Sequence, residues 1–285
     1  MRAHSGLGDA YYASGQIAPA EHHFATALEM SRANGSDPRL ALATAGMLGR
    51  CWGSALRLQE ARTLIESAMA EPAAAGYIQG QIVARQMLSG ILTLMGDASE
   101  GLRVSREALA LARAIGTRRF EVLVLRNMAR HLADLGDREQ ALCAARESLQ
   151  LSRSVGFEFV GPAVLGTLAR ITEDELERLD SLREGESFLN DRSLAHSHIG
   201  FRTEAIDACL EAGEWAEALR HAERLEALFQ PDLPIHLVMV VRRARLLAEI
   251  GAAGDPISPS HTQRLTALAA EMESFGFRGL SLALN

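Results

Sequence analysis

The sequence predicts an all-α protein, a right-handed superhelix (solenoid) of about seven antiparallel helix pairs. One ladder of small and apolar residues recurs about every forty residues, and self-similarity at such a fixed period indicates stacked helix pairs. The longer apolar segments, such as residues 104–115, have helical periodicity. No run of residues has the sustained alternation of a β-strand, which completes the prediction.

The ladder follows from the way two antiparallel helices pack. A small residue lets a neighbouring helix approach, a large residue fills the space between helices, a glycine ends the first helix, and an apolar stripe follows on the second helix. In the first copy these positions are Gly8, Tyr11, Gly15, Ala20, Phe24 and Ala27. The next copies include Leu48, Gly49, Trp52, Ala61 and Ile65, then Leu88, Leu92, Gly96, Gly101 and Ala108, then Met128, Ala129, Leu132, Gly136 and Ala141.

The offsets from Gly8 to Gly15 and from Gly8 to Phe24 resemble those of the tetratricopeptide repeat. This resemblance extends over nearly the whole chain. Two features depart from the family pattern: no proline ends each repeat, and the period is near 40 residues where the family standard is about 34. Helices longer by about two turns per pair account for the difference in period.

The pattern predicts one helical-repeat array over residues 1–285. Residues 1–155 form four regular pairs, separated by breaks that contain glycine or proline. Residues 156–192 form an irregular fifth pair, whose second helix opens on a predicted capping box at Thr172–Glu175, and end in a hinge at Asn190–Ser193. Residues 193–285 form two C-terminal pairs.

Composition excludes several classes of function. All 29 basic residues are arginine. Without lysine, the chain can form neither a Walker-type phosphate-binding loop nor a Schiff base with a substrate. The net charge of −7 argues against a nucleic-acid surface. No metal or cofactor motif is present, and we expect none to be bound; His196 and His198 are spaced wrongly for one ion on a helix.

Cysteines and targeting signals point to the cytoplasm. Cys51, Cys143 and Cys209 are odd in number and far apart, so we expect small core residues in a reducing compartment rather than disulfides. We find neither a leader segment nor a membrane-spanning stretch. The protein is therefore predicted to be soluble and cytoplasmic.

A narrower resemblance begins in the sixth pair. Residues 195–215, which include Phe201, Arg202 and Trp215, look like the C-terminal helical-repeat region of large bacterial ATPase-coupled adenylate/guanylate cyclase-type regulators. This resemblance implies a bacterial signalling role. The chain corresponds only to the repeat part, without the metal-binding aspartates of the cyclase or the phosphate loop of the ATPase.

We therefore expect a non-catalytic protein-interaction or sensory module. The alternative is a detached C-terminal regulatory fragment of a multidomain cyclase or ATPase-type regulator, with catalytic domains upstream. A transcriptional regulator with a C-terminal DNA-reading helix pair is disfavoured, because only residues 276–285 follow the last predicted helix.

The candidate partner site is a set of arginines. In proteins that the repeat resembles, the first helix of each pair lines the concave face, which places Arg50, Arg126, Arg130 and Arg170 in one groove. Arginine forks bind carboxylates bidentately, so an acidic peptide is the expected guest. The alternative is ordinary pairing along each helix, Arg130 with Asp134 and Arg170 with Asp174.

The ends of the array raise a second question of partners. A solenoid needs polar terminal repeats, yet the first predicted helix starts at once and the chain closes on Leu280, Leu282 and Leu284. We therefore expect an upstream domain or a second copy of the chain to cover at least one end.

Overall fold

The computed structural model describes residues 1–33, 38–71, 74, 76–190, 193–229, 232–254, 257–280 and 282. These residues form fourteen α-helices and no strand. The predicted solenoid of seven helix pairs is thus confirmed. The pairs are α1 (Arg2–Ala13) with α2 (Ile17–Ala33), α3 (Pro38–Ser54) with α4 (Leu58–Ala70), α5 (Ile78–Met95) with α6 (Ala98–Ala114), α7 (Arg118–Asp134) with α8 (Arg138–Val155), α9 (Phe157–Ile171) with α10 (Glu175–Ser187), α11 (Ala195–Glu211) with α12 (Trp215–Leu228), and α13 (Ile235–Ala253) with α14 (Pro259–Ser274).

The turns inside the first four pairs follow the ladder, with one exception. Gly15 and Gly136 both have φ of +82°, the left-handed conformation that glycine adopts without strain. At the equivalent turn between α3 and α4 the residue is Leu56, with φ of +58°. A leucine in this conformation costs about 1–2 kcal/mol, so its side chain must compensate by packing.

The start of α10 differs from the predicted capping box. Its N-cap is Asp174, whose carboxylate accepts hydrogen bonds from the backbone N–H groups of Leu176 and Glu177. Thr172 lies outside the helix and donates its hydroxyl hydrogen bond to the Glu177 carboxylate. Asp174 takes the cap because a carboxylate also favours the positive end of the helix dipole.

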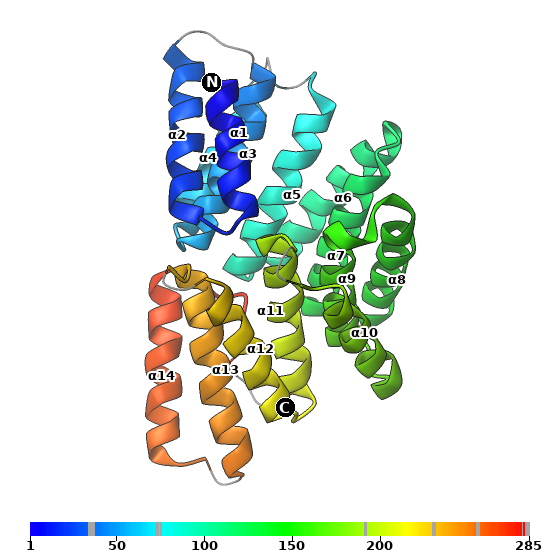
Figure 1. Cartoon of the computed structure of the whole chain (residues 1–285), viewed down its shortest axis with the longest axis vertical. Coiled ribbons are helices and arrows are strands. Elements are labelled where there is room, and N and C mark those ends of the chain that lie inside the picture. Colours follow the sequence, from blue (N-terminus) through cyan, green and yellow to red (C-terminus); the bar gives the residue numbers. More distant parts are fainter. Residues whose placement is uncertain are drawn as a thin grey trace.

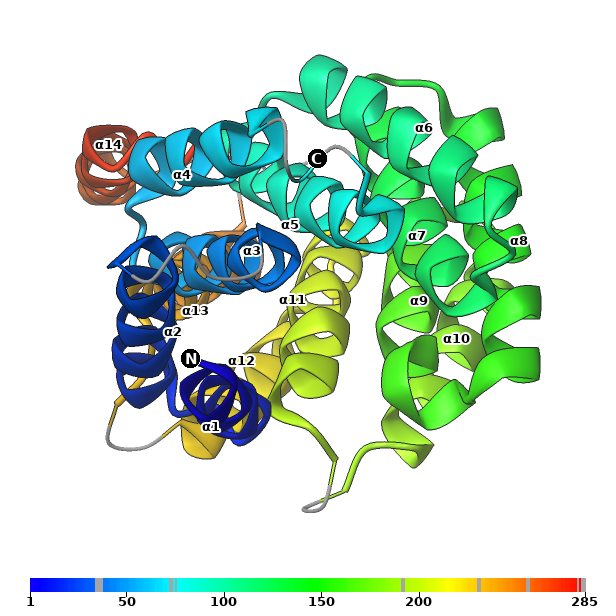
Figure 2. The same cartoon turned by 90° about the horizontal axis from the view of Figure 1, so that it is seen from above.

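Figure 2 shows how the pairs are layered. The first helices α3, α5, α7 and α9 lie on the inside of a curved array, and the second helices α4, α6, α8 and α10 lie on the outside. Helix α11 lies across the interior, packed along α9 and in contact with α1. The inner faces of α3 and α7 therefore look toward α11.

The two ends of the array meet. In Figure 1 the pair α13–α14 stands directly below α1–α4. Leu56 and Leu58 share one buried apolar cluster with Met239, Leu246 and Phe277.

Polar contacts reinforce this meeting of the ends. The His236 Nδ1 atom lies 3.0 Å from the Ser54 carbonyl oxygen, and the backbone N–H groups of Arg278 and Gly279 both donate to the Leu94 carbonyl. Leu280 and Leu282 pack on the chain's own clusters, and Leu284 lies outside the described residues. The expected cover of at least one end by an upstream domain or a second copy stays a prediction.

The three cysteines differ in burial. Cys51 and Cys209 are buried, as predicted, but Cys143 is exposed on the outer face of α8, so its assignment to the core was wrong.

In the part of the chain that the structure describes, no helix is both long enough and apolar enough to cross a membrane. Of the predicted hinge, residues 191 and 192 lie outside the described residues.

Candidate functional site

Three of the four predicted arginines converge on one carboxylate. Arg126 and Arg130 lie one turn apart on the inner face of α7, and Arg170 projects from α9. Their guanidinium nitrogens lie 3.2, 2.6 and 3.4 Å from the carboxylate oxygens of Glu204 on α11. Glu204 is 1% exposed, so this contact lies inside the array.

The Glu204 carboxylate stays ionised because of these neighbours. Burial on its own raises the pKa of a carboxyl group, but the three guanidinium groups outweigh burial and hold the pKa of Glu204 below its usual value. This arrangement also explains why Arg126 and Arg130 tolerate each other one turn apart. A shared counter-charge from another helix offsets their repulsion.

Arg126 also ties three helices together. Its Nε atom donates to the Ala163 carbonyl and to the Thr167 hydroxyl on α9, both at 3.0 Å, and its Nη2 atom donates to the Gly200 carbonyl on α11 at 3.1 Å. Burial, with the nearby charge of Arg130, lowers the pKa of Arg126 to about 10. The side chain thus spans the space between α7 and α11.

The predicted pairing along each helix is wrong. Arg170 contacts Asp134, which lies on the preceding first helix, at 2.5 Å, while Asp174 caps α10. Arg130 pairs with Glu204 and not with Asp134. Both pairs thus join different first helices, α7 with α11 and α9 with α7.

Arg50 lies on the same inner face but makes a different contact. Its Nε atom donates to the Tyr12 hydroxyl at 3.2 Å, between α3 and α1. Its charge acts on Arg126, on His196 and on His236, so it lies within electrostatic reach of all three. The four arginines therefore share the interior, but only three of them share Glu204.

The sequence analysis missed Glu204, although a signal was present. On α11 the residues Ser197, Phe201, Glu204 and Ala208 follow helical spacing and form one buried stripe. A glutamate inside such a stripe requires a buried cationic partner. The identity of that partner depends on the curvature of the array, which the repeat pattern leaves open.

Other candidate sites carry less chemistry. His196 packs between Tyr12 and Phe159, at ring distances of 6.3 and 4.9 Å, and burial lowers its pKa to about 4. His198 lies near the Asn190 carbonyl instead. Within the described ranges, no group of three or more His, Cys, Asp or Glu residues is placed to hold a metal ion.

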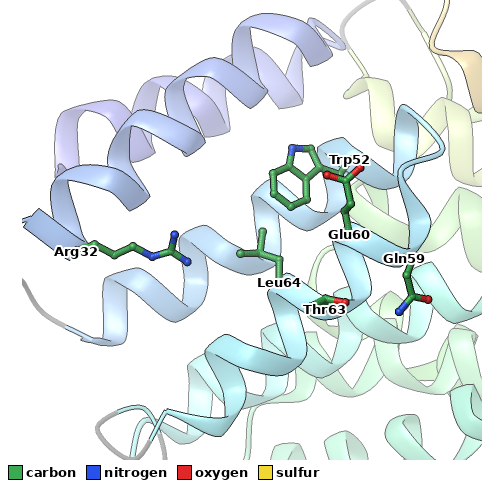
Figure 3. Close-up of a pocket in the computed structure, with 6 residues that line it drawn as sticks. All are labelled: Arg32, Trp52, Gln59, Glu60, Thr63 and Leu64. Atoms are coloured by element: carbon green, nitrogen blue, oxygen red, sulfur yellow. The ribbon is translucent and has the colours of Figure 1, made fainter.

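A shallow pocket of about 400 Å³ lies on the outer side of the first two pairs (Figure 3). Arg32 of α2, Trp52 of α3 and four residues of α4 line it; the latter are Gln59, Glu60, Thr63 and Leu64. The carboxylate of Glu60 is already held by Arg57. The pocket thus gathers no set of groups that suggests catalysis.

Comparison with known proteins supports the fold. No protein-family model matches the sequence, and no curated protein matches it. Among solved structures, a Rap protein complexed with Competence and Sporulation Factor superposes with a TM-score of 0.70 at 13% identity, over 95% of this chain and 75% of the Rap chain. A tetratricopeptide repeat protein from Parabacteroides merdae is 14% identical, with a TM-score of 0.48 over 98% of this chain and 95% of its own, a likeness too weak to add support.

At these identities the likeness to the Rap protein concerns the fold alone. The helix pairs, the glycine turns and this superposition agree with one another. The chain therefore has an all-α helical-repeat fold that is similar to that of tetratricopeptide repeats.

Proposed function

We propose that this chain is a non-catalytic interaction module of bacterial signal transduction, and that its concave face receives an acidic segment of a partner protein. The observation that carries the proposal is the gathering of Arg50, Arg126, Arg130 and Arg170 on one inner face. Among the groups in direct contact there, four guanidinium groups face two carboxylates, Glu204 and Asp134. In a chain of net charge −7 this is a local positive feature that attracts an anionic segment.

The structural comparison supports the general role. The Rap protein, which shares this fold, is described in complex with Competence and Sporulation Factor. A protein of this fold can thus form a complex with another molecule, which supports a binding role for this chain. We further propose that the role is non-enzymatic and cytoplasmic, so that the chain acts by binding a partner and not by catalysis.

A second candidate function is the regulatory part of a larger signalling protein. The segment 195–215, with its resemblance to the repeat region of ATPase-coupled cyclase-type regulators, favours this alternative. An upstream reading frame with cyclase and ATPase motifs, in the genome of origin, would support it. An upstream domain, or a second copy of the chain, would also cover the outer face of α1, where Leu7 is 46% exposed.

The proposal is tested with a defined acidic probe, a fluorescein-labelled hexaglutamate amide, titrated against the full chain by fluorescence anisotropy. Binding should weaken as salt rises, because ionic contacts are screened. The double variant Arg126→Ala/Arg130→Ala should abolish binding.

A matched variant controls for stability. The double variant leaves the Glu204 carboxylate buried with less compensation, so the triple variant Arg126→Ala/Arg130→Ala/Glu204→Ala removes that charge as well. Far-ultraviolet circular dichroism checks that helicity is retained. Equal affinity of wild type and both variants for hexaglutamate would refute the proposed role of the α7 arginines.

A further inference from the structure

Arg50 differs from every other arginine withdrawn from the surface. In the described part of the chain, the half-buried and buried arginines other than Arg50 all have a carboxylate within ion-pair distance. Every other arginine that the structure describes is exposed to water. Arg50 is half-buried and has a phenol in place of a carboxylate.

The donors around Arg50 are only partly used. Its Nε–H bond goes to the Tyr12 oxygen, and among the described residues its two terminal nitrogens make no hydrogen bond. The Tyr12 oxygen accepts that bond, so its own O–H remains able to donate. The guanidinium fork and the phenol thus place several N–H and O–H donors side by side.

Among the residues that the structure describes, no carboxylate lies within ion-pair distance of Arg50. Its charge reaches Arg126, which is cationic, two buried histidines, His196 and His236, the phenol of Tyr12 and the buried thiol of Cys51. Burial, followed by the charge of Arg50, lowers the pKa of His196 to about 4 and that of His236 to about 3, so both are neutral near pH 7. Tyr12 nevertheless outweighs burial and raises the pKa of Arg50, so the guanidinium group stays charged although no carboxylate among the described residues pairs with it.

We infer that Arg50 and Tyr12 form an oxyanion-binding site, the point at which a carboxylate of the incoming segment is held. A guanidinium fork with an adjacent hydroxyl suits a carboxylate or a phosphate oxygen. Arg126, Arg130 and Arg170 already hold Glu204 and act by positioning α11 and adding positive potential. The inference deepens the proposed function and rests on it for the source of the anion.

The first test uses inorganic phosphate as the probe and the melting temperature of the full chain as the readout. Phosphate at pH 7.5 should raise the melting temperature of the wild type more than sodium chloride at equal ionic strength, because a bound anion stabilises the folded state. In Arg50→Gln this phosphate-specific rise should disappear. In the matched control Arg57→Gln, whose arginine is already engaged by Glu21 and Glu60, it should persist.

The anion-free proteins give a second readout. Arg50→Gln should melt close to the wild-type temperature or above it, since it removes a half-buried charge that has no carboxylate partner. Tyr12→Phe, which keeps the ring and removes only the hydroxyl, should reduce the phosphate effect. This variant tests the oxyanion site even if Arg50→Gln folds poorly. A phosphate effect that survives both variants, or an anion-free Arg50→Gln that melts well below wild type, would overturn the inference.

Hexaglutamate separates this inference from the proposed function. Its dissociation constant should rise at least about tenfold in Arg50→Gln, the loss of one charge-assisted contact, and stay unchanged in Arg57→Gln. Binding that is lost in the α7 variants but intact in Arg50→Gln refutes the inference alone. A phosphate effect through Arg50 without any hexaglutamate binding refutes the proposed acidic partner and leaves the oxyanion site.

Discussion

The second and fourth helix pairs have the same repeat pattern but opposite surroundings. Arg50 on α3 and Arg130 on α7 both follow the small residue of the ladder by one position. Arg130 meets the buried carboxylate of Glu204 at 2.6 Å, whereas Arg50 meets only a phenol. The repeat therefore determines the direction of a side chain, while its partner comes from the helix that the curvature of the array brings opposite.

The turns of the same two pairs differ in a parallel way. Gly136 follows α7 with φ of +82°, and a Cβ atom there would meet nothing within 4 Å. Leu56 follows α3 with φ of +58° and is 4% exposed, in the cluster where the two ends of the array meet. The turn after α7 thus only reverses the chain, whereas the turn after α3 also packs its leucine side chain against the C-terminal helix pair.

The largest expected effect is that of Glu204→Gln. This change leaves three guanidinium groups around a buried amide, and breaking a buried ion pair from one side costs about 3–5 kcal/mol. Urea unfolding followed by circular dichroism measures it. Glu173→Gln, whose carboxylate is 77% exposed beside Arg138, is the control and should change stability by less than about 1 kcal/mol. A stable Glu204→Gln protein would mean that the contrast between α3 and α7 is not electrostatic.

The sequence predicted those parts of this comparison that depend on local pattern. Helical periodicity and glycine spacing predicted the seven pairs, and the resemblance to the tetratricopeptide repeat predicted the inward direction of the arginines. The role of Glu204 depends on how α11 crosses the interior, 74 residues from Arg130 along the chain, and no local pattern specifies it. The pairing of Arg170 with Asp134 was missed for the same reason.

The second prediction concerns Leu56, where we expect a glycine variant to be more stable than an alanine variant, the reverse of the usual order. Leu56→Ala should cost about 2–5 kcal/mol, because it removes a buried side chain and keeps the strained backbone. Leu56→Gly removes the same side chain but relieves about 1–2 kcal/mol of strain, so it should be the more stable of the two variants. Thermal and urea unfolding rank them, and the opposite order would show that the left-handed turn carries no strain.

Low pH should reduce the stability of the folded protein through buried histidines near both Arg50 and Arg130. His131 lies beside Arg130 and His236 beside Arg50, and burial, followed by these charges, lowers the pKa of each to about 3. The unfolded chain takes up protons near pH 6.5 and the folded chain does not. Each histidine therefore reduces stability by up to about 1.4 kcal/mol per pH unit as the pH falls below about 6.5.

Urea unfolding at pH 7.5, 6 and 5 measures this fall, and a variant isolates one histidine. His236→Gln should flatten the pH dependence, since it removes one group that titrates only in the unfolded state. His22→Gln, on the exposed face of α2, should leave the pH dependence unchanged. Stability that stays constant between pH 7 and pH 5 would contradict the burial of these imidazoles.

The smallest expected effect concerns the glycine turn of the fourth pair. Gly136→Val should destabilise the protein by about 1–2 kcal/mol, because a β-branched residue is strained in the left-handed conformation. Packing does not enter, since the new Cβ meets nothing within 4 Å. Gly90→Ala is the matched control, because its Cβ also lies in open space but its helical backbone is unstrained, and it should be neutral or slightly stabilising. Equal melting temperatures for Gly136→Val and wild type would mean that the turn after α7, unlike that after α3, adapts its backbone to the residue it is given.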